Sequence, residues 1–170
     1  MLDGRSNRHE LDICLSQVNF AAPLDYNQNQ APIAVECCSI EHIQAFTSAR
    51  DALPPHFKPF LTPYTVDDYL AMQARLFLNT EYQGGFAIIG NQLTSLFSLP
   101  GAYLGHMLIA LAKDQGAEYL SCYDTNNKLT SMYAHHGFQE VRRTPWNEDL
   151  APAGWDYTLW GRPDFVEMSL

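Results

Sequence analysis

The stretch of the sequence that decides the fold is NNKLTSMYAHHGF, from Asn126 to Phe138. Its pattern predicts a short helix that presents Tyr133 and ends at Gly137, because glycine readily adopts the left-handed conformation found after many helices. The aromatic residue Phe138 then leads into a strand that runs to Arg142. A helical tyrosine framed in this way is the strongest indication of function in the chain.

The chain before this stretch alternates between strand and helix patterns. Ser39 precedes an apolar helical stripe, and Pro54 and Pro55 stop that helix, because proline lacks an amide donor and disfavours helix in the residue before it. Thr65 begins a second helix, since its hydroxyl can cap the amide of Asp68. The predicted elements are a strand at Pro32–Glu36, a helix from Ile40 through Ile43 and Phe46 to about Asp51, a helix from Thr65 through Tyr69, Met72, Leu76 and Phe77, a hairpin of Phe86–Ile89 and Gln92–Ser98, a helix at Leu104–Lys113 and a strand at Glu118–Tyr123.

Glycine and proline residues mark the breaks between these elements. Gly90–Asn91 is expected to form the hairpin turn with positive φ, and Gly116 is expected to end the third helix. Residues 144–162 predict a long ordered loop over the surface, because they combine prolines and glycines with three tryptophans. Asp164–Met168 supplies a closing strand. Together these elements predict an α/β (α+β) fold, with a mixed sheet and helices on its faces.

Length and composition indicate a globular chain. A chain of 170 residues suits one domain, and 46% of its residues are hydrophobic. No apolar run approaches the roughly 20 residues that span a bilayer, and the N-terminus has no apolar core typical of a secretion signal. We therefore expect a cytoplasmic protein with no membrane segment. Residues 1–31 are polar and predict an arm that is poorly ordered or packs with a partner, whereas residues 32–170 predict a single domain.

Charge and metal-ligating residues exclude several classes of function. The net charge of −9 opposes binding to nucleic acid and favours a basic acceptor such as an amine. The four cysteines lack the CxxC spacing of a zinc site, so free thiols are expected. His135 and His136 would point about 100° apart on a helix, which argues against a shared metal. His106, in the first turn of its helix, is expected at the surface, where it can touch a bound anion.

The frame from Asn126 to Phe138 resembles the second half of the acyl-CoA-binding core of the GNAT superfamily of N-acetyltransferases. The predicted order of elements over residues 32–170 is also the GNAT order, and Asp164–Met168 is similar to the Asp-apolar-apolar-x-Met pattern of the family's closing strand. This resemblance implies a twisted, splayed sheet flanked by helices.

The resemblance also implies where acetyl-CoA binds. In the family, the strand before the central helix diverges from its neighbour, and its unpaired backbone holds the pantetheine arm; the corresponding residues here are Leu96, Phe97 and Ser98. The pyrophosphate lies on amides of the next turn, where free N–H groups and the helix dipole favour an anion. The residues of that turn are Gly101, Ala102, Tyr103, Leu104 and Gly105.

This turn departs from the family pattern Gln/Arg-x-x-Gly-x-Gly/Ala. If Gly105 is the last glycine, Tyr103 stands in place of the middle glycine and Pro100 in place of the Gln or Arg. A Cβ then crowds the approach of the phosphate, and proline donates no hydrogen bond. Alternatively, Pro100 corresponds to the proline that often precedes the motif, the turn is about three residues shorter, and Gly101 is its flexible point.

The resemblance implies roles for three further residues. Tyr133 would protonate the leaving thiolate, since an unperturbed phenol has a pKa of about 10, close to that of a thiol; the alternative is a tyrosine that packs its ring against the sheet. Asn126 would bond the pantetheine arm, cap the following helix, or both. No carboxylate lies in Gln92–Ser98, where many members carry a base, so Asp124 is the candidate proton acceptor, the alternative being a solvated cap.

Three hypotheses follow. The first is an acyltransferase that moves an acetyl or related acyl group from acyl-CoA to a small-molecule or protein amine by direct attack, with Tyr133 as general acid. The second is a GNAT-like domain without a donor site that binds a protein partner, as a phage or mobile-element accessory would; Tyr103 or another chain would then fill the donor cleft. The third is a GNAT-fold transferase that uses another activated donor. A homo-oligomer or a partner bound through the N-terminal arm is compatible with each.

Overall fold

Seven strands form one sheet in the computed structural model, which describes residues 32–170. The polar arm expected at residues 1–31 lies outside the described residues. The strands are β1 (Val35–Glu36), β2 (Arg75–Leu78), β3 (Gly84–Ile89), β4 (Gln92–Ser98), β5 (Tyr119–Tyr123), β6 (Gln139–Thr144) and β7 (Phe165–Ser169). The helices are α2 (Ile40–Asp51), α3 (Val66–Ala71), α4 (Gly105–Asp114), α5 (Lys128–His135) and α6 (Tyr157–Trp160), with 3-10 turns at Lys58–Phe60, Thr125–Asn127 and Glu148–Leu150.

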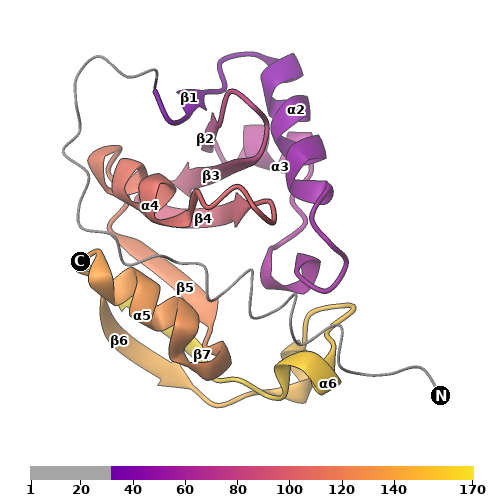
Figure 1. The fold of residues 1–170 in the computed structure, drawn as a ribbon, viewed down its shortest axis with the longest axis vertical. Coiled ribbons are helices and arrows are strands. Elements are labelled where there is room, and N and C mark those ends of the chain that lie inside the picture. Colours follow the sequence, from indigo (N-terminus) through magenta and orange to yellow (C-terminus); the bar gives the residue numbers. More distant parts are fainter. Residues whose placement is uncertain (1–31) are drawn as a thin grey trace.

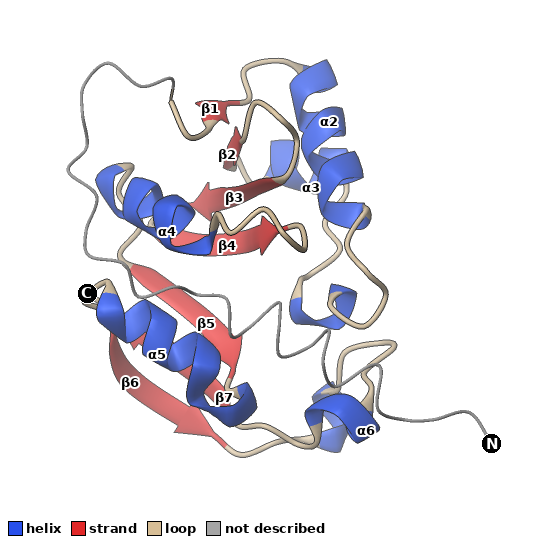
Figure 2. Cartoon of the chain, in the orientation of Figure 1, coloured by secondary structure: helices blue, strands red, loops and turns tan. Residues whose placement is uncertain are grey.

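The strands follow the order β1-β2-β3-β4-β5-β7-β6. Neighbouring strands are antiparallel except β4 and β5, which are parallel. The sheet therefore has two halves joined where β4 meets β5: β1–β4 in the upper part of Figure 1 and β5–β7 in the lower part. Figure 2 shows the same division, with helices beside each half. The predicted mixed sheet flanked by helices is confirmed.

Two hydrophobic cores hold the helices on this sheet. The α2–α3 core lies on one face of the β1–β4 half and consists of Ile43, Phe46, Ala49, Leu53, Tyr69, Leu76, Leu78, Ala87 and Phe97. The α4–α5 core lies on the opposite face and extends across both halves; it includes Phe77, Phe86, Ile88, Leu93, Leu104, Leu108, Ile109, Leu120, Cys122, Tyr133, Phe138, Val166 and Met168. Because successive strand residues point to opposite faces, Phe77 lies in one core and its neighbours Leu76 and Leu78 lie in the other.

Most helix ends are where the sequence predicts them. The Ser39 hydroxyl caps α2, and Thr65 and Asp68 form a reciprocal capping box at α3. Gly116 (φ 96°) and Gly137 (φ 93°) end α4 and α5 in left-handed conformations. In both cases the amide after the glycine reaches back to a carbonyl in the last turn, which satisfies groups that the helix leaves unpaired.

The prediction that α3 continues through Leu76 and Phe77 is wrong, because both residues lie in β2. Gln73 adopts φ 53°, and the amide of Ala74 donates to the carbonyl of Tyr69 over 2.9 Å. This is the same helix-ending arrangement that glycine forms elsewhere in the chain. The sequence did not indicate it, since glutamine rarely takes this conformation and a short apolar run suits a buried strand as well as a helix.

Two smaller predictions also need correction. In the hairpin between β3 and β4, Gly90 has φ 63°, whereas Asn91 is not a positive-φ residue. The segment from 144 to 162 is not loop throughout: β6 runs to Thr144, and the segment contains one 3-10 turn and α6, which Asp156 caps. Within residues 32–170, no helix combines the length and the hydrophobicity needed to cross a bilayer.

Candidate active site

The two halves of the sheet separate at their junction. β4 and β5 pair at only two positions, Gln92 with Tyr119 and Leu93 with Leu120, although both strands continue beyond them. From Thr94 to Ser98, β4 therefore makes no ladder with β5, while its other edge remains paired with β3. The splay expected at Leu96, Phe97 and Ser98 is present, and within residues 32–170 it leaves backbone donors and acceptors on this edge without a strand partner.

A tight turn connects this edge to α4. The amide of Ala102 donates to the carbonyl of Leu99 over 3.0 Å, and Gly101 has φ 84°. Proline followed by a positive-φ glycine is typical of a type II turn. The Ser98 hydroxyl then accepts from the amide of Leu104 over 3.2 Å, which holds the turn against β4.

The N-terminus of α4 offers amides to a ligand. The first amide bonded inside the helix is that of Leu108, which donates to Leu104 over 2.9 Å. The amides of Gly105, His106 and Met107 have no acceptor among residues 32–170. Together with the helix dipole, three such amides favour an anion.

Two residues of the turn show how the backbone accommodates its unusual sequence. Tyr103 adopts φ 54°, the conformation that a glycine would supply in the family pattern, and its side chain is 55% exposed. A Cβ placed on Gly105 would meet only the Met132 sulfur, at an ordinary 3.5 Å. Among residues 32–170 no contact therefore requires glycine at position 105, so the absence of a side chain there leaves room for a ligand at the start of the helix.

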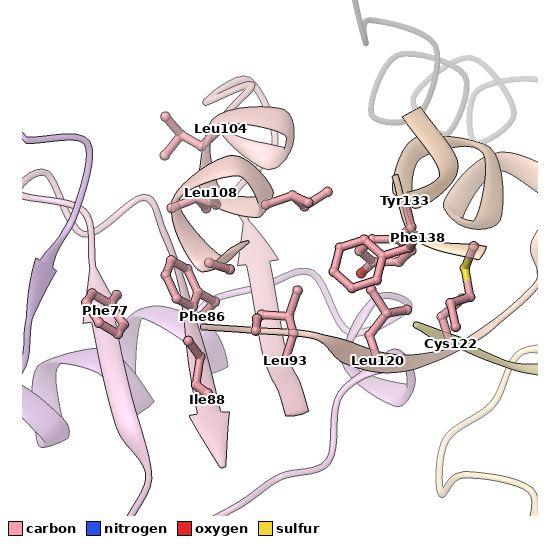
Figure 3. Packing of buried hydrophobic residues seen from close by; sticks show 14 of the residues in the cluster. Phe77, Phe86, Ile88, Leu93, Leu104, Leu108, Leu120, Cys122, Tyr133 and Phe138 are labelled. Atoms are coloured by element: carbon pink, nitrogen blue, oxygen red, sulfur yellow. The ribbon is translucent and has the colours of Figure 1, made fainter. Parts of the chain in front are cut away.

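Tyr133 lies beneath α5 at the junction of the two halves. Its side chain is 7% exposed, and its ring packs edge to face against Phe138 at 6.2 Å between centroids. Figure 3 shows the ring beside Phe138, between α5 and the part of the sheet that carries Leu120 and Cys122. Burial raises the pKa of Tyr133 strongly, and the nearby Cys122 adds to the shift. Burial also raises the pKa of Cys122 to about 12, so this thiol stays protonated.

Asp124 is a buried structural partner. Its side chain is 2% exposed; Thr130 donates to one carboxylate oxygen over 2.8 Å, and Arg143 donates to the other over 2.7 Å. Thr130 belongs to α5 and Arg143 to β6, so Asp124 connects the end of β5 to both. It is not the solvated cap that the sequence offered as the alternative.

Asn126 does not cap α5. The residue before the helix is Asn127, whose side chain makes no capping bond, and Asn126 stands one position earlier with φ 55°. The capping role is therefore wrong. The side chain of Asn126 is exposed at the end of β5, on the side where the strands have separated.

Sequence reasoning missed a pair of histidines that joins the two helices on this face. His106 Nδ1 and His136 Nε2 lie 2.8 Å apart, and Lys113 donates to the carbonyl of His136. Burial and the neighbouring cations lower the pKa of His136 to about 4. Because thirty positions separate the two histidines, no local sequence pattern predicts their contact. Within residues 32–170 no group of three potential ligands is arranged for a metal ion.

The tryptophan loop closes the far end of β5. Tyr123 contacts Trp146 at 5.5 Å and Trp155 at 5.1 Å between ring centroids, and Trp155 is buried. Trp160 donates to the carbonyl of His56 over 3.0 Å, which ties this loop to the segment between α2 and α3. Trp155 and Trp160 therefore anchor this loop to the rest of the protein. Trp155 packs against β5, and Trp160 bonds the segment between α2 and α3, so the loop contacts both halves of the sheet.

Comparison with known proteins defines the class of fold. No protein-family model and no curated protein matches the chain. Among solved structures, spermidine N-acetyltransferase from Vibrio cholerae, in complex with CoA and spermine, is similar with a TM-score of 0.57 and 15% identity, covering 82% of this chain and 96% of that one. A putative acetyltransferase from Salmonella typhimurium, with its cofactor acetyl-CoA, is similar with a TM-score of 0.52 and 13% identity, covering 81% and 92%. The chain has the GNAT fold.

Proposed function

We propose that this protein is an N-acyltransferase that moves an acetyl or related acyl group from acyl-CoA to an amine. The observation that carries the proposal is the separation of β4 from β5 directly beside the amides at the start of α4. An extended pantetheine arm can pair with an open strand edge, and a pyrophosphate suits unpaired helix amides. The two similar acetyltransferase structures were solved with CoA or acetyl-CoA, which supports the same donor here.

The proposed donor site divides into two parts. The backbone of Leu96, Phe97 and Ser98 holds the pantetheine arm, and Asn126 reaches it from the 3-10 turn that follows β5. The turn from Gly101 to Gly105 holds the pyrophosphate, with Ala102, Tyr103 and Leu104 contributing backbone. The similar structures give no support to the hypothesis of a protein-binding module whose donor cleft is filled by Tyr103, a residue whose side chain is 55% exposed.

The chemistry needs one attack and two proton transfers. The neutral amine nitrogen of the acceptor attacks the thioester carbonyl carbon, so that a C–N bond forms and the C–S bond breaks. The nitrogen releases one proton, for which Asp124 is the predicted acceptor, and the CoA thiolate takes one from the Tyr133 hydroxyl, which is then reprotonated from solvent. Burial raises the pKa of Tyr133, so the phenol is protonated at neutral pH. The same shift makes it a weaker acid than an unperturbed phenol, so the proposed proton transfer depends on the thiolate lying within hydrogen-bond reach of the hydroxyl.

Asp124 as proton acceptor stays a prediction. Both of its oxygens already accept hydrogen bonds, one from Thr130 and one from Arg143. Its second proposed role is to position Tyr133, because Thr130 and Tyr133 belong to the same helix. The net charge of −9 favours a cationic amine as the acceptor.

Calorimetry with acetyl-CoA tests the donor site. The wild type is expected to bind with a Kd below about 1 mM, and Gly105→Ala is expected to weaken binding roughly tenfold. The same substitution should leave the thermal midpoint unchanged or raised, because alanine favours helix and the added Cβ meets no close protein atom. Absence of wild-type binding would contradict the CoA proposal.

Tyr133→Phe tests whether the Tyr133 hydroxyl acts as the general acid. We expect kcat to fall about 10²-fold or more while the Kd for acetyl-CoA is retained, because the ring and its packing remain and only the proton donor is lost. Tyr119→Phe is the matched control: it removes a hydroxyl from the paired end of β5, where Tyr119 bonds Glu167. A Tyr133→Phe enzyme with the wild-type rate would remove the acid role and leave the donor site intact.

A further inference from the structure

A buried polar chain crosses the α2–α3 core and ends on β4. Arg50 donates to the Tyr69 hydroxyl over 2.9 Å, and that hydroxyl shares a hydrogen bond of 2.7 Å with Ser95. Arg50 also donates to the carbonyl of Tyr64 over 2.8 Å and pairs with Asp51. The three residues Arg50, Tyr69 and Ser95 are 4%, 0% and 4% exposed. Buried polar groups of this kind are costly unless every partner is present.

Ser95 is the residue at which β4 is irregular. Gly85 of β3 pairs with Phe97 of β4, and Ala87 pairs with Thr94. One residue lies between the two positions on β3, whereas two residues, Ser95 and Leu96, lie between them on β4. The extra residue makes a β-bulge, and Ser95 within it has φ 50°. Such a conformation is strained for a residue other than glycine and persists only where the surroundings impose it.

The bulge changes which way the later residues of β4 face. In a regular strand Leu93 and Phe97, four positions apart, would share a face, and Leu96 would point away from both. Instead, Leu93 lies in the α4–α5 core with Leu96 packed against it, while Phe97 lies in the α2–α3 core. The change of face occurs between Leu93 and Leu96, at the point where β4 leaves β5.

We propose that Arg50 and Tyr69 are positioning residues for the acyl donor: they hold the bulge at Ser95 and thereby set the backbone of Leu96–Ser98 for the pantetheine arm. This inference rests on the proposed function, since it concerns the same donor site. The bond from Tyr69 fixes the Ser95 side chain from the α2–α3 core, and Arg50 fixes Tyr69 in turn. Neither residue touches the reacting atoms.

Tyr69→Phe tests the inference, because it removes the hydroxyl and keeps the ring that packs on Phe46 at 5.7 Å between centroids. We expect the Kd and the KM for acetyl-CoA to rise about tenfold, equivalent to about 1.4 kcal/mol. The KM for the amine, and kcat at saturating donor, should change by less than about twofold, since the acid and acceptor groups are untouched. A general loss of folded enzyme would instead lower kcat and leave both KM values unchanged.

Two further variants keep the result interpretable. Tyr64→Phe is the matched control: its ring lies 5.5 Å from that of Tyr69, but only its backbone carbonyl bonds Arg50, so donor binding should be unchanged. Ser95→Gly removes the hydroxyl while suiting the positive φ, and it should weaken donor binding as Tyr69→Phe does. If Tyr69→Phe fails to fold, donor binding by Ser95→Gly alone tests the inference.

The outcomes separate the two proposals. If wild-type protein does not bind acetyl-CoA, the proposed function fails, and this inference fails with it. If the wild type binds and Tyr69→Phe or Ser95→Gly binds equally well, the inference is overturned and the proposed function stands. Equal losses in Tyr64→Phe and Tyr69→Phe would also overturn it, because the effect would then not depend on the hydrogen-bonded chain.

Discussion

In the β1–β4 half of the sheet, helices cover both faces, whereas in the β5–β7 half α5 covers one face and the other carries polar and aromatic side chains. The first half is held by two hydrophobic cores. On the second half, Tyr119 and Arg142 meet Glu167, and every residue of β6 is exposed. The proposed site lies where these two differently built halves separate.

The two halves of the sheet therefore contribute different parts of the proposed site. The doubly covered half keeps β4 in a strained bulge, which requires dense packing on the side away from α4. The other half has one hydrophobic core, on the face that α5 covers, and it carries ion pairs on its surface. The halves share the α4–α5 core, so Tyr133 and the start of α4 remain in fixed relation although the strands diverge.

The largest expected effect comes from removing the core that only the first half has. Phe46 is fully buried and contacts the rings of Tyr69 and Phe97 at 5.7 and 5.4 Å. Phe46→Ala should lower the free energy of unfolding by about 3–5 kcal/mol, because it removes a buried ring and leaves a cavity. Val141→Ala on β6, where the side chain is 57% exposed, should change it by less than about 0.5 kcal/mol. Urea denaturation measures both, and similar losses would show that the halves do not differ as described.

A smaller effect is expected from the ion pairs of the second half. Arg143→Met leaves the buried Asp124 carboxylate with Thr130 as its one remaining side-chain partner in the described chain and should cost about 2–3 kcal/mol. Arg142→Met, at a side chain that is 68% exposed, should lower the thermal midpoint much less, because solvent screens its ion pair with Glu167. Thermal denaturation of the two variants gives the comparison. Equal midpoints would mean that the burial of Asp124 has no energetic consequence.

The smallest effect concerns the histidine contact between the helices of the two halves. The pKa of His136 falls from 6.5 to about 4, first through burial and then through His106, His135 and Lys113. Between these values the unfolded chain binds a proton that the folded chain does not, so stability is complete above about pH 6.5 and is lost as the pH falls toward 4.

Because His136 is partly exposed, we expect a loss of only about 1 kcal/mol between about pH 7 and pH 5. His136→Asn should reduce this loss when urea midpoints are compared at the two pH values. An unchanged pH dependence in the variant would show that other groups carry the acid sensitivity.

Local signals account for what could be predicted from the sequence. Gly116 and Gly137 mark helix ends because glycine tolerates positive φ, whereas Gln73 takes the same role without any such signal. The splay at Leu96–Ser98 was implied by resemblance and is present in the structure, whereas the role of Tyr133 stays a prediction. The histidine pair and the Arg50–Tyr69–Ser95 chain were not foreseen, because their members lie far apart in the sequence.

The sequence by itself determined the caps of α2 and α3, the glycine-ended helices, the Pro100–Gly101 turn and the frame around Tyr133, since each depends on backbone preferences within a few residues. Only the tertiary structure decided that Leu76 and Phe77 form a strand, that Asp124 is held by Arg143, and that Ser95 sits in a bulge tied to Tyr69. These features depend on which surfaces meet across the sheet, and hydrophobic burial selects such long-range contacts for the whole chain at once.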